Sequence, residues 1–236
     1  MRRSGITAAA LLAAGCSANA ASGGSASRVF PVSGTVSAIS AAGPDDVEVV
    51  TGAQLQVSAT GPADVLDRLE VRVEGNRLMV GRKTERLEVL GGGRSTARIR
   101  VVAPPLRAAD LAGSGTLRLQ QLTGGAMALA SAGSGTVDAG DVRGESIKLE
   151  IAGSGDVRAR GQVGQASFSV AGSGAIRAGD LQSGSASVSI AGSGSAEVRA
   201  SRSANISIMG SGNARVRGTG NCQVSRMGSG EARCGL

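Results

Sequence analysis

The 236-residue sequence has no histidine, tryptophan or tyrosine, and Phe30 and Phe168 are its only aromatic residues. A serine or cysteine nucleophile therefore has no histidine base beside it, and a zinc site has no imidazole ligand. Single-stranded nucleic acid finds no aromatic side chains on which its bases could stack. We therefore expect no cofactor, no metal ion and no nucleic acid partner.

Long hydrophobic runs and blocks of like charge are also missing. Beyond the amino terminus, no apolar run is long enough to cross a bilayer. The formal net charge is +7, but the arginines that produce it are scattered, so a disordered basic tail is not expected. This charge favours anionic partners such as an anionic glycan, lipopolysaccharide or another envelope surface, without choosing among them.

The first 20 residues have the features of an export signal. Two arginines precede the short apolar segment GITAAALLAAG, which is the order found in signal peptides. Two processing sites remain open: LLAAGC predicts a lipoprotein with Cys16 as its lipidated first residue, and ANA predicts ordinary cleavage after Ala20. Residues 21–29 are expected to be a linker. The protein is therefore expected in the outer membrane as a lipoprotein, in the periplasm or at the cell surface.

Glycine, in contrast, is abundant, and its placement is periodic. The tripeptide Gly-Ser-Gly occurs seven times, and its first glycines are Gly113, Gly133, Gly153, Gly172, Gly192, Gly210 and Gly228. The spacings are 20, 20, 19, 20, 18 and 18 residues, a regularity that indicates a solenoid rather than a disordered chain. We expect a corner at each copy, because glycine reaches backbone angles barred to other residues. The serines are expected to hydrogen-bond the turn backbone or each other.

Apolar and polar residues alternate on both sides of each corner. Ala166, Phe168 and Val170 are one example, and their spacing is typical of a strand with one buried face. We therefore expect an all-β, single-domain parallel β-helix with about seven rungs of 18–20 residues over residues 111–236. The β-rich residues 30–110, whose pattern suggests antiparallel strands, are expected to cap its amino-terminal end.

Three stretches in a fixed order carry a resemblance to a known family. They are DDVEVVTGAQLQVSATGPADVLDRLEVRVEGNRLMV, then ARIRVVAPPLRAADLAGSGTLRL, then the Gly-Ser-Gly rungs. Residues 30–236 resemble the bacterial exported proteins described as "putative auto-transporter adhesin, head GIN domain". The resemblance implies a β-helical fold and export, and the family name suggests adhesion. The family offers no catalytic motif.

The outward positions after the corners carry many of the arginines. Those five or seven places after one of the first six leading glycines are Arg118, Arg158, Arg160, Arg177, Arg199, Arg215 and Arg217. Together they would form a basic stripe able to bind phosphate or carboxylate groups. Asp138 and Glu197 interrupt the stripe, so a solvated face that only keeps the protein soluble is the alternative interpretation.

Cys222 and Cys234 are the cysteines that remain after processing. They lie six residues on either side of Gly228 and form an even pair in an oxidising compartment. We expect a disulfide that closes the last rung, the alternative being two small buried thiols. Two cysteines without further ligands do not make a zinc site.

These features predict a non-catalytic protein of the cell envelope, with an adhesin-like binding module as the leading interpretation. One alternative is a structural periplasmic lipoprotein without a specific ligand. The other is a polysaccharide-active enzyme that uses Asp141 and Asp180, which share one alignment position two rungs apart. Sugar-cleaving clefts are usually lined with aromatic residues, so an enzyme is not expected.

Overall fold

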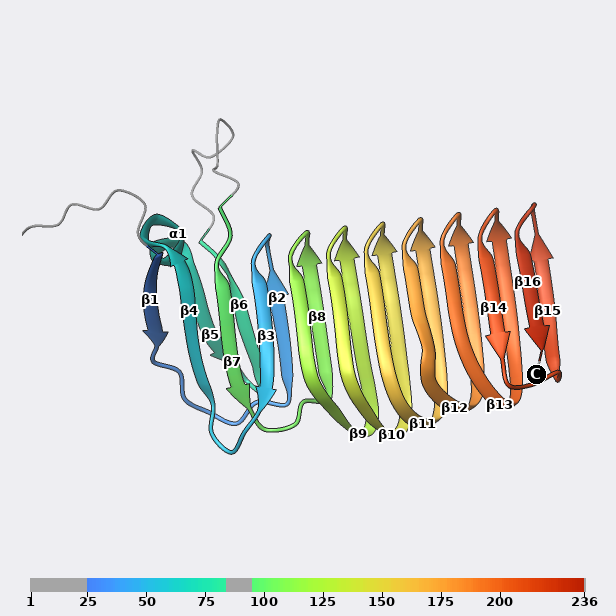
Figure 1. Ribbon diagram of the computed structural model, residues 1–236, viewed down its shortest axis with the longest axis horizontal. Helices are drawn as coiled ribbons and strands as arrows, with labels where there is room; N and C mark the ends of the chain where they lie inside the picture. Colours follow the sequence, from blue (N-terminus) through green and yellow to red (C-terminus); the bar gives the residue numbers. More distant parts are fainter. Residues whose placement is uncertain (1–24, 84–94, 236) are drawn as a thin grey trace, which may run out of the picture.

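The structure, a computed structural model, describes residues 25–83 and 95–235. The expected signal peptide and Cys16 lie outside these residues. The described chain forms a flattened β-solenoid (Figure 1). From residue 108 onward its turns lie side by side in chain order, whereas strands of the amino-terminal region are interleaved. Its elements are β1 (Ser25–Phe30), β2 (Ala38–Ala42), β3 (Asp46–Thr51), β4 (Gln56–Pro62), α1 (Ala63–Arg68), β5 (Leu69–Glu74), β6 (Arg77–Arg82), β7 (Arg98–Ala103), β8 (Ala108–Gly113), β9 (Thr116–Gly133), β10 (Thr136–Gly153), β11 (Asp156–Gly172), β12 (Ala175–Gly192), β13 (Ser195–Gly210), β14 (Asn213–Arg217), β15 (Cys222–Met227) and β16 (Glu231–Gly235).

Each of the strands β9 to β13 runs through a whole turn of the solenoid. The chain leaves a Gly-Ser-Gly corner, crosses one layer, bends at a second corner and returns across the other layer to the next Gly-Ser-Gly. Neighbouring turns pair in parallel, with Val137 opposite Val157 and Ile147 opposite Ala166. The predicted all-β parallel solenoid is confirmed, and its seven corners bound six complete turns.

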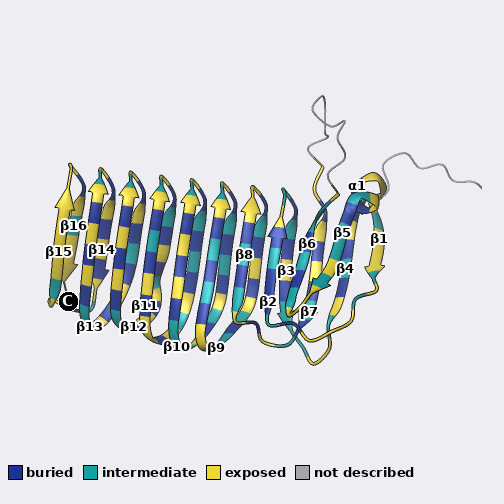
Figure 2. Cartoon of the chain, turned by 180° about the vertical axis from the view of Figure 1, so that it is seen from behind, coloured by how far each residue is buried: buried dark blue, intermediate teal, exposed yellow. Residues whose placement is uncertain are grey.

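One hydrophobic core fills the space between the two layers. Inward positions such as Val157, Phe168 and Ile176 are at most 1% exposed. The residues that alternate with them along each strand face solvent. The alternation is visible as bands of buried and exposed residues along the strands (Figure 2). Burial of both layers against each other, rather than any single strand's propensity, therefore holds the stack together.

The leading glycine of each corner has a backbone angle that requires glycine. Its φ lies between +117° and +125° at all seven corners, a range that L side chains rarely adopt. The corners are joined by backbone hydrogen bonds, for example from the Ser154 amide to the Gly133 carbonyl at 2.9 Å. Among the corner serines of the described chain, a hydroxyl–hydroxyl hydrogen bond links Ser211 to Ser229 at 3.0 Å. Hydrogen bonds between successive corners are thus made mainly by backbone groups rather than by the serine hydroxyls.

The amino-terminal region departs from the expected antiparallel cap. β2 pairs in parallel with β6 and β8, and β3 pairs in parallel with β7 and β9. The corner between β2 and β3 has Gly43 at φ +113°, directly beneath Gly113, although it lacks the Gly-Ser-Gly motif. This region therefore extends the same two layers. Among the strands described within residues 25–83 and 95–113, antiparallel pairing is confined to β1–β4, β4–β7 and β5–β6.

The first strand begins inside the segment expected to be a linker. Ser25–Phe30 form β1, which pairs antiparallel with β4 at the edge of the sheet. Arg28 donates a hydrogen bond at 2.9 Å to the carbonyl of Leu66 in α1. Helix α1 in turn buries Val65 and Leu66, so β1 and α1 together close the amino-terminal end of the core.

A buried ion pair fastens the Gly43 corner. Asp45 is 5% exposed and accepts hydrogen bonds from Arg82 at 2.6 and 2.8 Å and from the Ala97 amide at 2.8 Å. Burying this carboxylate is tolerated because its oxygens are satisfied. At the β5–β6 hairpin, the pKa of Arg72 is raised, first by its hydrogen bond to Glu74 and then by the charge of Glu70.

No helix in residues 25–83 and 95–235 has the length and apolar character needed to cross a bilayer.

Candidate functional site

A continuous row of charged side chains crosses one layer of the solenoid. We call this layer the arginine sheet; it consists of β1, β4, β7 and β3, the parts of β9 to β13 that follow the Gly-Ser-Gly corners, and β14 and β16. Parallel register places its outward residues side by side in the order Arg100, Glu48, Arg118, Asp138, Arg158, Arg177, Glu197, Arg215 and Arg233. The row is therefore a mixed ladder with more positive than negative rungs.

Three of the seven arginines singled out in the sequence are neutralised by neighbouring turns. Their ion pairs are Arg160–Asp138 at 3.2 Å, Arg177–Asp156 at 2.8 Å and Arg217–Glu197 at 2.5 Å. All three pairs are partly exposed, so each adds little to stability. Because these three guanidinium groups are already paired, they are less available to bind a ligand.

The other four arginines keep their charge uncompensated. Arg118, Arg158, Arg199 and Arg215 have no ion pair with an acidic residue within the described part of the chain. Arg118 and Arg215 lie on the flat arginine sheet. Arg199, by contrast, lies where its strand bends into the second corner. The predicted stripe is thus divided between a flat face and a corner.

The second corner contains a groove of 920 Å³. Arg199 and Arg202 line one end, and Arg143 lines the other, where its Nε donates a hydrogen bond to Asp141 at 2.9 Å. The amide side chains of Gln162 and Gln182 lie between the ends. Arg143 and Arg202 were missed in the sequence because the corner changes length from turn to turn, which breaks their alignment columns.

The opposite layer has a different outward surface. We call the outward residues of β15 and of the parts of β9 to β13 that precede the Gly-Ser-Gly corners the serine face. They are almost all Ala, Ser, Asn, Gln or Met, and the charged residues Lys148 and Glu150 pair with each other at 2.7 Å. In the last turn Arg226 of β15, in register with the inward Ile208, is also exposed. A shallow hollow of 580 Å³ lies over this face. Near the carboxyl-terminal end of the serine face, Met209 and Met227 are 56% and 71% exposed.

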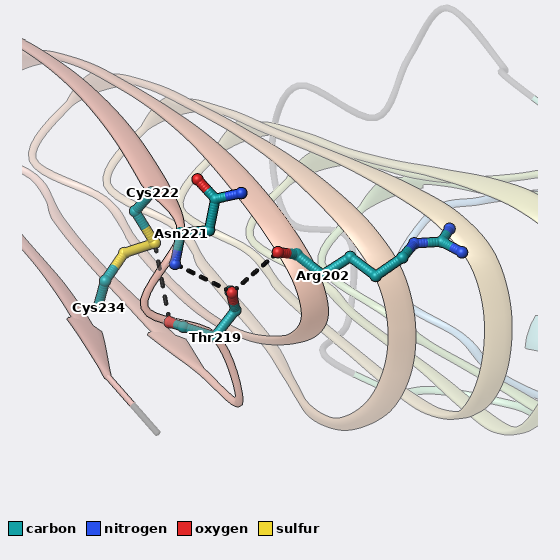
Figure 3. Close-up of a disulfide and its surroundings, with 5 residues drawn as sticks. All are labelled: Arg202, Thr219, Asn221, Cys222 and Cys234. Carbon is teal, nitrogen blue, oxygen red and sulfur yellow. Dashed lines mark hydrogen bonds between the residues drawn. A yellow bond between two sulfur atoms is a disulfide. The ribbon is translucent and has the colours of Figure 1, made fainter.

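A disulfide joins the two layers in the last turn. Cys222 in β15 and Cys234 in β16 are linked through their sulfur atoms, with their Cα atoms 6.6 Å apart (Figure 3). Neighbouring Thr219 Oγ1 donates to the carbonyl of Arg202 at 3.0 Å and accepts from the Asn221 amide at 3.1 Å. These contacts tie the last turn to the turn before it.

The residues considered for catalysis do not form a carboxylate pair in one groove. Asp141 lines the second-corner groove and is bound to Arg143. Asp180 is exposed and lies in the segment Gly179–Leu181, which has no partner in β13. Within the described residues, no group of three or more potential metal ligands is present.

Comparison with known proteins places the fold in context. The sequence profile of the family "Putative auto-transporter adhesin, head GIN domain" matches residues 35–220. The chain belongs to this family. A comparison with curated proteins finds no match.

Several solved structures share the fold. A Bacteroides fragilis protein described as a "putative adhesin" is 22% identical, with a TM-score of 0.80 over 90% of this chain and 98% of that one. A Parabacteroides distasonis protein described as a "putative lipid binding protein" is 26% identical, with a TM-score of 0.70 over 90% and 97%. A Parabacteroides merdae "putative adhesin" is 17% identical, with a TM-score of 0.69 over 90% and 96%. The head GIN fold therefore accounts for nearly the whole described chain.

Proposed function

We propose that this head GIN protein is a non-catalytic binding module of the cell envelope that holds an anionic polymer against its arginine-bearing side. The observation that carries the proposal is the unequal charge of the two layers. Unpaired arginines gather on the arginine sheet and at the second corner, whereas the serine face holds one internally neutralised pair. Guanidinium groups bind carboxylates and phosphates through charge-assisted hydrogen bonds.

Export fits both the chemistry and the family. A disulfide such as Cys222–Cys234 persists in oxidising compartments and is rare in the cytosol. The arginine-rich, apolar amino terminus supports entry into the export pathway. In this proposal lipidation at Cys16 anchors the module to the outer membrane, and the family name supports an adhesive role.

Binding is tested by passing the protein, purified after export, over immobilised lipopolysaccharide and over immobilised anionic glycan at increasing salt. Retention at low salt that is lost as salt rises is expected, because screening weakens exposed charge contacts. A variant with Arg118, Arg158, Arg199 and Arg215 all replaced by glutamine should pass through unretained. If the wild-type protein is not retained on either surface, the proposal fails.

The location is tested by protease shaving of intact and lysed cells. A protease site inserted into the segment 17–28 would report the exposure of the domain even if the solenoid itself resists cleavage. Cleavage on intact cells supports an adhesive role at the surface. Cleavage only after lysis would place the domain in the periplasm and overturn the adhesive role.

Lipid binding is a second candidate, and the shallow hollow over the serine face favours it. Its lining includes Ala108, Ala126 and Ala128 together with Met127, and the 26% identical structural relative is described as a "putative lipid binding protein". Co-sedimentation with vesicles of neutral phosphatidylcholine tests this candidate. Binding that is insensitive to salt and lost in Ala128→Asp would support it; failure to co-sediment would exclude it.

A further inference from the structure

The groove at the second corner results from turns of unequal length. Corner residues are lost between β10 and β11 and again between β12 and β13, where Gly179–Leu181 have no counterpart. The shortened turns leave a recess beside their longer neighbours. This recess crosses five successive turns, from Gly144 in β10 to Gly218 after β14. With strands about 4.8 Å apart, the groove is about 19 Å long.

Glycine keeps the floor of the groove low. Gly144, Gly161, Gly164, Gly184 and Gly218 lie along it. At Gly164 a β-carbon would lie 2.8 Å from the carbonyl oxygen of Glu145, so the close packing of neighbouring turns excludes a side chain there. A ligand in the groove can therefore approach the backbone closely.

Two arginines project into this recess without acidic partners. The Arg202 side chain extends along the stack, away from the disulfide and towards the earlier turns (Figure 3). It reaches across to Gly184, where a β-carbon would collide with its Nη2 atom. Neither Arg202 nor Arg199 forms an ion pair with an acidic residue within residues 25–83 and 95–235. Both guanidinium groups are therefore available to a ligand.

We propose that this groove, rather than the flat arginine sheet, is the binding site for an extended anionic polysaccharide. In this site Arg199 and Arg202 bind the carboxylate groups of the sugar chain, and the exposed amides of Gln162 and Gln182 bind its hydroxyl groups. The inference rests on the proposed function, whose anionic ligand it places at one site and assigns to one chemical class.

The shape and lining of the groove favour a polysaccharide over a lipid. An elongated recess about five turns long matches a linear polymer. Its lining consists of arginine, amide, hydroxyl and glycine groups and one carboxylate, Asp141, which is paired with Arg143. Its apolar members, Val163 and Ala200, are buried beneath the surface. Acyl chains would find little apolar surface there.

Isothermal titration of the protein, purified after export, with a galacturonic acid tetramer tests the site. The methyl-esterified tetramer is the uncharged control ligand and should bind at least about tenfold more weakly. The double variant R199Q/R202Q should lose about 100-fold in affinity, from about tenfold per arginine. The isosteric Gln182→Glu change adds a negative charge to the groove and should also weaken binding, about tenfold.

The flat arginine sheet is the competing location of the site, and R118Q/R215Q, which removes two of its exposed charges, tests it directly. The affinity of this variant should stay within about threefold of the wild-type value, because charges outside the groove act only through a screened field. Circular dichroism checks that every variant is folded.

The possible outcomes separate this inference from the proposed function. If R118Q/R215Q loses affinity and R199Q/R202Q does not, the groove assignment is overturned and the proposed function stands. If the wild type is retained on anionic surfaces but does not bind the tetramer, the polysaccharide assignment is overturned. The polysaccharide assignment is also overturned if R199Q/R202Q abolishes binding to phosphatidylglycerol vesicles but leaves binding of the tetramer unchanged. If no anionic surface or ligand binds, both proposals fail.

Discussion

The two layers of this solenoid share their inward chemistry and differ in their outward chemistry. On the arginine sheet, outward positions at one height carry Arg158, Arg177 and Glu197 in adjacent turns. On the serine face, the equivalent run is Ser169, Ser189 and Ser207. The inward residues of both layers are almost all apolar. Stacking dictates what points inward, whereas the outward positions are free to differ, so folding does not require the charge asymmetry between the layers.

The second corner strengthens this contrast. At the Gly-Ser-Gly corners, successive turns repeat the same backbone angle and the same hydrogen bonds. At the second corner the register shifts between several turns, and the unpaired Arg199 and Arg202 lie there. Regularity on one edge provides the scaffold, and irregularity on the other provides the recess.

The largest expected effect tests the difference between inward and outward positions of one strand. Phe168→Ala should lower the free energy of unfolding by about 4 kcal/mol, because it removes a side chain that is 1% exposed and leaves a cavity. Its outward neighbour provides the control, since Ser169→Ala should change stability by less than about 0.5 kcal/mol. Urea denaturation followed by circular dichroism measures both. Equal losses for the two variants would contradict the assignment of inward and outward faces.

The next effect concerns the corner that joins the layers. Gly172→Ala should cost about 3 kcal/mol, because φ is +125° and the added methyl group would collide with the Gly153 carbonyl. Replacement of the adjacent exposed serine, Ser173→Ala, should cost less than about 0.5 kcal/mol. Thermal unfolding of the two variants gives the comparison, and a Gly172→Ala protein as stable as wild type would refute the strict need for glycine.

A smaller and more local effect is expected for the disulfide between the layers. Replacing both Cys222 and Cys234 with serine should cost about 2–3 kcal/mol, because the unfolded chain regains the freedom of a short loop. Hydrogen exchange should become faster in β15 and β16 and remain unchanged in β9 to β11. Uniformly faster exchange along the chain would show that the last turn does not open independently.

The smallest effect on stability is expected when charge is moved to the neutral layer. Ser169→Arg combined with Ser189→Arg should change the unfolding free energy by less than about 0.5 kcal/mol, since both residues point outward. Placed in the R199Q/R202Q background, the two new arginines should leave binding of the galacturonic acid tetramer impaired. Restored binding would indicate that net charge alone, without a groove, governs recognition.

The sequence predicted the solenoid because its signals are local and repeated. Each Gly-Ser-Gly corner and each alternating stretch points to the same stacked arrangement, so the copies reinforce one another. The corner at Gly43 was not predicted, because AGPDD lacks the Gly-Ser-Gly motif. Gly43 nevertheless turns the chain in the same way, with a φ of +113°. The parallel pairing of β2 and β3 escaped because alternation is the same in parallel and antiparallel strands that are buried on one face.

The candidate site was only partly predictable. The columns of Arg118, Arg177 and Arg215 follow directly from counting along the repeat. Which arginines are neutralised depends on side-chain direction across turns, as in the pair between Arg177 and Asp156. The groove arises from small differences in corner length, and a missing residue in a repeat does not reveal whether the chain moves inward or outward.

Arginine-specific footprinting tests the central claim most directly. The protein is treated with phenylglyoxal, alone and saturated with polygalacturonate, and methionine oxidation is measured in parallel by mass spectrometry. The account predicts that the polymer protects Arg199 and Arg202, while Met209 and Met227 on the serine face oxidise at the same rate with and without it. Unchanged arginine modification together with protected methionines would place the ligand on the serine face and contradict the account.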